Sequence, residues 1–180
     1  MQLNLDTDAV IILAVNNNKK RGDIMDILNY LKSLNIKYEI FEHIAVFTVD
    51  EAKKISTNIP GAHCKNLFLR NRKGNEHYLV ILLEDKEIKL KDLSKEINST
   101  SLSFASKERL KKYLNLEPGS VGPFGLINDT KNEVTVIIDK EILKSEKATF
   151  HPNRNTATIC LLCNDLITFI EKQGYIIIYI

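Results

Sequence analysis

The spacing of apolar residues predicts helices and strands that alternate along the chain. From Ile24 to Leu34, apolar side chains recur every three or four positions behind Asp23, which predicts an amphipathic helix with an N-cap. A short strand is expected at residues 38–41. The capping box at residues 48–51 predicts that a second, short helix begins there.

Two β-hairpins are expected in the middle of the chain. Residues 67–70 and 77–83 flank a polar, glycine-containing turn, and the second run is apolar on both faces, which places it in the centre of a sheet. Residues 124–127 and 134–138 flank another polar turn and are expected to pair in the same way. Such hairpins between helices predict one α/β (mixed α+β) domain with a mixed, mostly antiparallel sheet.

The remaining elements follow from the same patterns. The apolar run at residues 175–180 is too apolar to stay exposed, so it joins either the sheet or a subunit interface. Helices are expected at 90–97, 106–114 and 164–172, and strands near Thr149 and at 156–161.

Composition narrows the class of protein. The chain has 180 residues, 44% of them hydrophobic, which fits one folded domain. Its net charge of +2 excludes a protein that binds nucleic acid through one broad basic face.

Lysine supplies 20 of the 25 basic residues, and Asn and Ile are also frequent. All three amino acids have A/T-rich codons, so codon bias explains much of the lysine excess. The Lys-rich stretch 107–112 is therefore first interpreted as a solvated helix face, with contact to an RNA backbone as the alternative.

The cysteines and the N-terminus favour the cytoplasm. Three cysteines are too few, and odd in number, for a disulfide framework. Cys160 and Cys163 have a CxxC spacing, but their apolar surroundings favour buried thiols over a zinc or redox site. The apolar run 9–15 follows two aspartates and is too short to span a bilayer, so neither a targeting segment nor a membrane partner is expected.

Lys65 is the first candidate functional residue. On a strand, it shares a face with Leu67, whereas Asn66 takes the other face. A lysine at the head of an apolar stripe could hold a fixed positive charge for a phosphate or a developing oxyanion. The alternative is a lysine whose ammonium group simply reaches water.

Two loops supply the other candidates. The glycine-rich stretch 119–125 could bring backbone N–H groups close to a ligand, or could be a plain connection from helix to strand. His151 precedes a proline, which favours an extended backbone and a defined direction for a group suited to proton transfer. A structural histidine is the alternative.

Four ordered blocks together resemble the YbaK/ProX family of aminoacyl-tRNA deacylases. They lie at residues 42–52, 65–69, 119–129 and 150–156, and the resemblance spans about residues 23–172. It implies a barrel-like mixed sheet surrounded by helices, in one editing domain over residues 23–180. Residues 1–22 would then form an extension packed on or beside that domain.

The resemblance also implies roles for individual residues. Lys65 matches the family's essential lysine and His151 matches the histidine of its Phe-His-Pro block, so both are expected at the catalytic centre. The residues expected to bind the substrate are Asn66, Gly119, Ser120, Val121, Gly122, Pro123, His43, Thr48 and Asn155.

The activity implied is hydrolysis, in trans, of the ester of alanine wrongly attached to proline tRNA. The expected partner is the acceptor end of tRNA(Pro), with prolyl-tRNA synthetase as a further partner and no DNA. No metal or cofactor is implied, because the vicinal 2′-hydroxyl of the terminal adenosine could help to activate water. The alternatives are removal of cysteine from the same tRNA and a catalytically silent tRNA-binding module.

Overall fold

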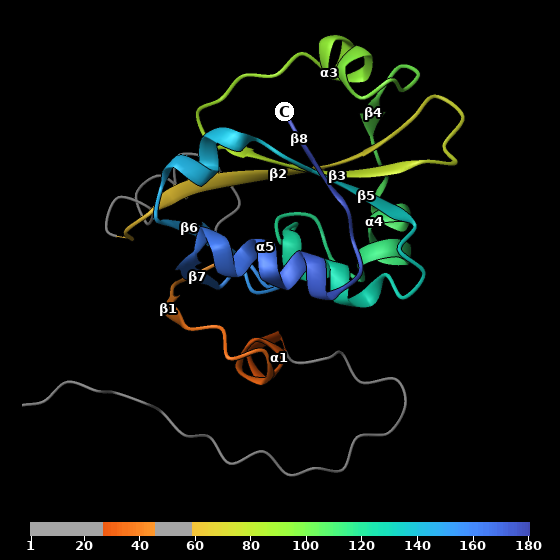
Figure 1. Ribbon diagram of the computed structural model, residues 1–180. Coiled ribbons are helices and arrows are strands. Elements are labelled where there is room, and N and C mark those ends of the chain that lie inside the picture. The colour runs from red at the N-terminus through yellow and green to blue at the C-terminus, as the bar shows by residue number, and fades with distance from the viewer. Residues whose placement is uncertain (1–26, 46–58) are drawn as a thin grey trace, which may run out of the picture.

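The computed structural model describes residues 27–45 and 59–180, which form one mixed sheet with helices on both of its faces (Figure 1). The expected extension 1–22, the expected helix at 48–51 and the candidate residue Thr48 lie outside the described residues. None of the described helices is both long enough and apolar enough to cross a membrane.

The sheet contains parallel and antiparallel pairs. The strands are β1 (Tyr38–Glu42), β2 (Ala62–Arg70), β3 (His77–Leu83), β4 (Ser103–Phe104), β5 (Val134–Ile138), β6 (Lys147–Phe150), β7 (Ala157–Leu162) and β8 (Ile177–Tyr179). Their order is β1-β7-β6-β2-β3-β5-β8, with β4 beside β2. The antiparallel pairs are β1–β7, β6–β7, β2–β3 and β2–β4, and the parallel pairs are β2–β6, β3–β5 and β5–β8, which confirms the mixed, mostly antiparallel sheet.

Burial of β3 on both faces organises the core. Leu79 and Ile81 point into the larger apolar cluster, on the side of α5 (Cys163–Lys172). Val80 and Leu82 point into the smaller one, under α3 (Leu90–Glu96). The first predicted hairpin and the central position of its second strand are therefore confirmed.

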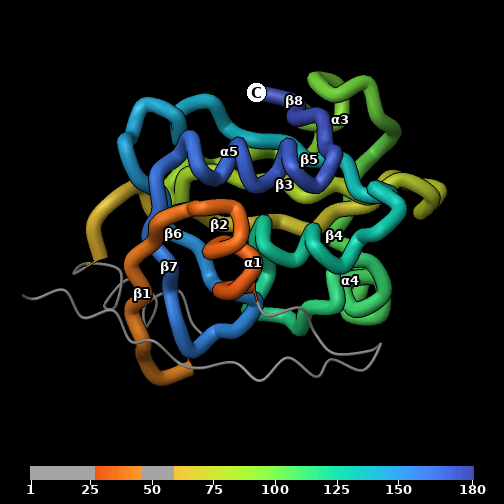
Figure 2. Tube along the Cα trace, turned by 60° about the horizontal axis from the view of Figure 1, so that its bottom comes forward, coloured from red at the N-terminus to blue at the C-terminus, as the bar shows by residue number. Residues whose placement is uncertain are grey.

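The helices cover the two faces of the sheet unequally. α5 lies across the face opposite α3 and packs against α1 (Ile27–Ser33) through an edge-to-face contact of Phe169 with Tyr30, whose ring centroids are 6.0 Å apart (Figure 2). α4 (Lys107–Leu114) begins at the predicted cap, because the Ser106 hydroxyl accepts a hydrogen bond from the backbone of Arg109 at 3.4 Å. A short 3₁₀ helix, η2 (Lys140–Lys144), follows β5.

The second predicted hairpin is wrong. Residues 124–127 lie within a 3₁₀ helix, η1 (Pro123–Asn128), and β5 pairs with β3 and β8 instead. Proline at the first helical position favours this turn. Gly125 then lets it pack tightly, since a Cβ there would lie only 2.7 Å from a Leu116 methyl carbon. The apolar run is buried, but its backbone is helical and not extended as expected.

The structure decides the place of the C-terminal run and of two of the cysteines. The run joins the sheet as β8, and Tyr175 and Ile180 at its two ends are buried, but Ile176 is 88% exposed and Ile178 and Tyr179 are exposed as well, so the expectation that the run is too apolar to stay exposed holds only at its ends. Cys160 and Cys163 are buried free thiols that donate to the carbonyls of Pro60 and Ile142, and burial raises the pKa of both. Among the described residues no group of three or more metal-binding side chains occurs.

Asp129 ties the end of η1 to the start of β5 and to the C-terminal segment. Its buried carboxylate accepts hydrogen bonds from the backbone of Glu133 and Val134, at 3.1 and 2.8 Å, and from the Tyr175 hydroxyl at 2.8 Å. If the carboxylate were removed, the two backbone N–H groups would lose this partner, and the Tyr175 hydroxyl would keep only its longer bond, of 3.3 Å, to the Asp129 backbone carbonyl.

We therefore expect Asp129→Ala to lower the free energy of unfolding by about 2–4 kcal/mol, because buried donors are left unsatisfied. Urea denaturation measures this loss. The matched control is Asp92→Ala, which removes an exposed pair with Lys95 and should cost less than about 0.5 kcal/mol. Equal losses in the two variants would show that the Asp129 contacts contribute nothing special.

Candidate functional site

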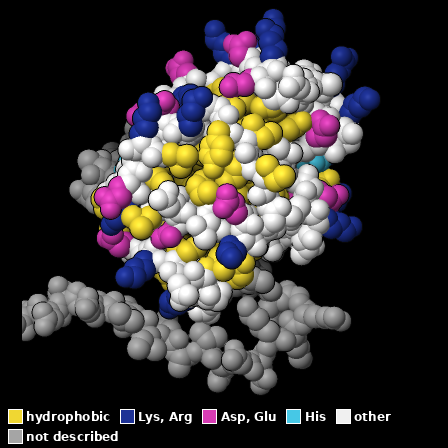
Figure 3. Space-filling view, in the orientation of Figure 1, with side chains coloured by type: hydrophobic (Ala, Val, Ile, Leu, Met, Phe, Trp, Pro, Cys, Tyr) yellow, Lys and Arg dark blue, Asp and Glu magenta, His cyan; other side chains and the backbone are white. Residues whose placement is uncertain are grey.

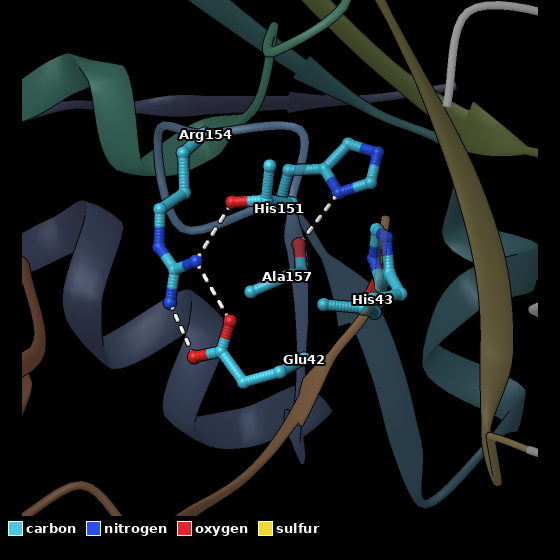
Figure 4. Close-up of polar contacts among 7 residues, drawn as sticks. Glu42, His43, His151, Arg154 and Ala157 are labelled. Carbon is cyan, nitrogen blue, oxygen red and sulfur yellow. Dashed lines mark hydrogen bonds and ion pairs between the residues drawn. The ribbon is translucent and has the colours of Figure 1, made fainter. Parts of the chain in front are cut away.

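His151 lies in the loop between β6 and β7, with its imidazole held in one orientation. Its Nδ1 is 2.8 Å from the carbonyl oxygen of Ala157, so Nδ1 donates and Nε2 keeps its lone pair (Figure 4). Burial is the main reason that the His151 pKa lies below its ordinary value. A charged His43 nearby lowers it further, while the Ala157 bond opposes the shift. A neutral imidazole with an available Nε2 can accept a proton.

His43 follows β1 directly and faces His151. The two ring centroids are 5.9 Å apart, and Figure 4 shows the rings next to each other. The His43 Nδ1 donates to the Ile44 carbonyl at 2.8 Å, and its Nε2 lies 3.1 Å from the Thr158 hydroxyl. Two of the expected site residues that are far apart in the sequence are therefore neighbours in the fold.

The glycine loop lies against the His151 loop. A Cβ at Gly122 would be 3.4 Å from the His151 carbonyl oxygen, and one at Gly119 would be 3.9 Å from the Asn155 amide nitrogen. Gly119 has φ +89°, a conformation that favours glycine. Ser120 is buried, with its hydroxyl donating to the Glu117 carbonyl at 2.8 Å, Val121 packs against the larger core, and Pro123 begins η1.

Asn153 joins these two loops, although it is not among the site residues expected from the sequence. Its side-chain Nδ2 donates to the carbonyl of Phe124 in η1 at 3.2 Å, and its backbone N–H donates to the His151 carbonyl at 2.9 Å. Its φ of +59° lies in the left-handed region, which Asn adopts more readily than most residues. An asparagine directly after Pro152 is therefore the sequence feature that could have indicated a sharp turn here. The Asn153 Oδ1 is buried and has no hydrogen-bond partner among the described residues.

Lys65 and Asn66 leave β2 on opposite faces, as their alternation predicts. Asn66 shares the face of Phe68 and the larger core, and its buried Oδ1 also lacks a partner among the described residues. Lys65 lines a surface groove with Leu67, Glu87, Ile88, Lys89 and Asp92. The pairing of β2 with β6 ends at His63 and Thr149. Lys65 and His151 each lie two residues beyond this point, and no hydrogen bond or ion pair joins them in the described structure.

Glu42 and Arg154 fasten the His151 loop to the end of β1. The guanidinium donates through both terminal nitrogens to the two carboxylate oxygens of Glu42, and at 2.8 Å to the Thr156 hydroxyl (Figure 4). This ion pair holds the pKa of Glu42 below its ordinary value. The Thr156 carbonyl in turn accepts the His43 backbone N–H at 2.9 Å. The loop that carries His151 is thus joined to the strand that precedes His43.

Comparison with known proteins gives this arrangement a family. Residues 43–169 match the model of the aminoacyl-tRNA editing domain, a range that includes both loops. The chain therefore belongs to the aminoacyl-tRNA editing domain family, and the resemblance seen in the sequence is confirmed.

Individual relatives agree with this assignment. The chain is 44% identical, over 80% of its length and 88% of the relative, to the prolyl-tRNA editing protein ProX of Acetoanaerobium sticklandii. It is 35% identical, over 86% of its length and 94% of the relative, to the prolyl-tRNA synthetase associated domain-containing protein 1 of Xenopus laevis. A crystal structure assigned as a trans-editing enzyme for prolyl-tRNA synthetase shares the fold, with a TM-score of 0.63 at 16% identity over 86% of this chain and 95% of that one.

The contact between the two histidines makes one electrostatic prediction. We expect His151 to titrate below about 6.5, the ordinary histidine value, in an NMR titration of the imidazole signals. In His43→Gln the pKa should move toward that value but stay below it, because burial is the larger cause. His63→Gln, which changes a histidine bonded to Thr149 instead, is the control. A His151 pKa at or above the ordinary value would contradict the described burial.

The Glu42–Arg154 pair makes a second prediction, about local order. In Arg154→Ala the backbone amides of His43 and Asn153 should exchange their hydrogens up to about fivefold faster, since an exposed ion pair contributes at most about 1 kcal/mol. Hydrogen exchange followed by NMR measures this. Lys147→Ala breaks a comparable ion pair, between β6 and Glu39 of β1, and should leave both amides unchanged. Equal exchange in wild type and Arg154→Ala would mean that the pair does not hold the loop.

Proposed function

We propose that this protein is a trans-editing deacylase that hydrolyses the ester linking alanine to the 3′ end of proline tRNA. The observation that carries the proposal is the meeting of the His151 loop with the glycine loop, beside His43 and within the family-matched region. The 44% identity to a prolyl-tRNA editing protein over most of both chains supports proline tRNA as the substrate.

The chemistry asks little of the protein, because an aminoacyl ester is already activated. Water adds to the carbonyl carbon, the bond to the ribose oxygen breaks, and that oxygen leaves with a proton. The neutral His151 can accept the proton of the attacking water at Nε2, and the vicinal 2′-hydroxyl of the tRNA is a second group that can assist. The proposal needs no metal ion.

Two unpartnered amide oxygens suggest how the substrate is oriented. The Oδ1 atoms of Asn66 and Asn153 are buried without hydrogen-bond donors among the described residues. An unsatisfied buried acceptor is costly, and a bound ammonium or hydroxyl group would satisfy it. We assign these oxygens to the α-amino group of the aminoacyl moiety and to the hydroxyls of the terminal ribose.

Lys65 takes a different part in the proposal. It lies on the other face of β2, in a groove where Glu87 and Asp92 are the acidic neighbours. A lysine there can bind a phosphate of the acceptor end of the tRNA. The bound phosphate would hold the ester close to the point where the pairing of β2 with β6 ends. Selection for alanine over proline is a matter of size at the glycine loop.

The deciding experiment measures deacylation of alanyl-, cysteinyl- and prolyl-tRNA(Pro) by the purified protein. We expect fast loss of alanine, slower loss of cysteine and none of proline. Lys65→Ala should slow alanine release by about 100-fold, the scale for a lost group that stabilises charge in the transition state. Lys89→Ala, another lysine lining the same groove, is the matched control and should keep nearly full activity.

Each alternative has its own outcome in this assay. Preferential release of cysteine would move the protein to the cysteine-removing branch. If alanyl-tRNA(Pro) survives as long as in buffer while tRNA still binds, the protein is a silent binding module and the proposal fails. Loss of activity in a chelator, restored by one added metal, would overturn the metal-independent mechanism.

A further inference from the structure

The basic residues of α4 divide into two groups. Lys107 and Lys111 both pair with Glu117, at 3.2 and 3.6 Å. Arg109 and Lys112 have no acidic partner among the described residues, and Arg109 faces the turn between β2 and β3. The sequence suggested a solvated helix face, whereas the structure shows one side whose two lysines share the charge of Glu117 and one side whose cations have no acidic partner among the described residues.

Arg109 fastens that turn to α4. Its Nη1 donates to the Gly74 carbonyl at 2.7 Å and lies 2.8 Å from Nε2 of His77. A Cβ at Gly74 would come within 2.8 Å of the other guanidinium nitrogen, so the turn and the helix are in close contact. The His77 ring in turn packs on Tyr113, with centroids 4.0 Å apart.

The same contact gathers positive charge. Arg72 and Lys73 lie in the turn, next to Gly74, and neither has an ion pair in the described part of the chain. Basic side chains stand along the right-hand margin of Figure 3, the side on which this turn and α4 lie. Glu76, on the same hairpin, keeps its negative charge, but it accepts hydrogen bonds from Asn71 and Tyr78 and forms no ion pair in the described part of the chain.

The pKa of the buried His77 is affected by this positive charge. Its pKa is lowered to about 4, mainly by burial and then by the charges of Arg109, Lys112 and Arg70. Burial is the main cause of the shift, the three cations add to it and Asp129 opposes it, so the shift agrees with the excess of positive charge that the Arg109 contact brings to this side of α4. A surface with this field attracts a polyanion.

This basic surface, formed by Arg72, Lys73, Arg109 and Lys112, adjoins the glycine loop through η1. The Asn128 side chain in η1 donates to the carbonyl of Leu114, the last residue of α4, at 2.8 Å. Lys112 is in the last turn of that helix. A ligand that enters at the glycine loop can therefore continue onto the basic surface.

We propose that this basic surface binds the ribose-phosphate backbone of the acceptor stem of the tRNA, with Lys73 and Lys112 as direct phosphate contacts and Arg109 as the residue that positions the turn. The inference rests on the proposed function, because it assigns a path to the substrate of the same site. Helical RNA presents its phosphates and 2′-hydroxyls to such a surface, which needs no sequence-specific groups.

The test compares two double variants of equal charge change on two substrates. Lys73→Glu/Lys112→Glu reverses charge on the basic surface, and Lys107→Glu/Lys111→Glu reverses it on the side paired with Glu117. Each is assayed with alanyl-tRNA(Pro) and with the small ester alanyl-adenosine. The first variant should raise KM for the tRNA about tenfold, with little change in kcat or in hydrolysis of the small ester, and should reduce the log–log salt dependence of KM by about 1–2.

Three results would overturn the proposal. One is an unchanged KM in the first variant, and another is an equal rise in both, which would indicate net charge and not this surface. The third is loss of binding to prolyl-tRNA synthetase with tRNA kinetics intact, which would make the surface a protein contact. Should the wild type release no alanine, the proposed function fails by itself, and binding of uncharged tRNA(Pro) to the same variants still decides whether the surface binds RNA.

Discussion

Burial of β3 on both faces is the constraint on which the rest of the structure depends. A strand covered on two sides needs helices above and below the sheet, and here α3 supplies one cover and α5 the other. Its neighbour β2 must then send alternate side chains to different sides. Asn66 and Lys65 are adjacent in sequence but on opposite faces, so the proposed site uses both sides of one strand where it leaves its paired neighbour.

Patterns that depend on near neighbours could be predicted from the sequence, and those that depend on distant ones could not. The hairpin of β2 and β3, the Ser106 cap and the pairing of the C-terminal run with the sheet follow from periodicity and local capping chemistry. The run at 124–127 was misassigned because a short apolar segment does not distinguish a strand from a buried turn of helix. The family resemblance supplied His43 and the two loops, but not the contacts between them.

The missed interactions share a physical cause. Asn153 bonds to Phe124, and Arg154 to Glu42 across 112 positions, so each exists only after the sheet has brought β1, β6 and η1 together. Both residues lie within the His151 block, but the local sequence there carries no mark of their distant partners. Irregular loops lack strand partners, and side chains such as these replace the missing backbone hydrogen bonds that would otherwise fix their shape.

Charge follows the same division between local and distant effects. A net charge of +2 is compatible with an RNA substrate because neutralisation is uneven: Glu117 offsets part of the charge on one side of α4, while the side facing the β2–β3 turn has no acidic partner among the described residues. The loops proposed to carry the chemistry need the opposite condition. There the His151 pKa is lowered, so the imidazole is neutral near pH 7 and can accept a proton. The basic surface and the His151 loop are separate in the fold. The surface can therefore attract phosphates while His151, the residue proposed to act as the base, stays neutral.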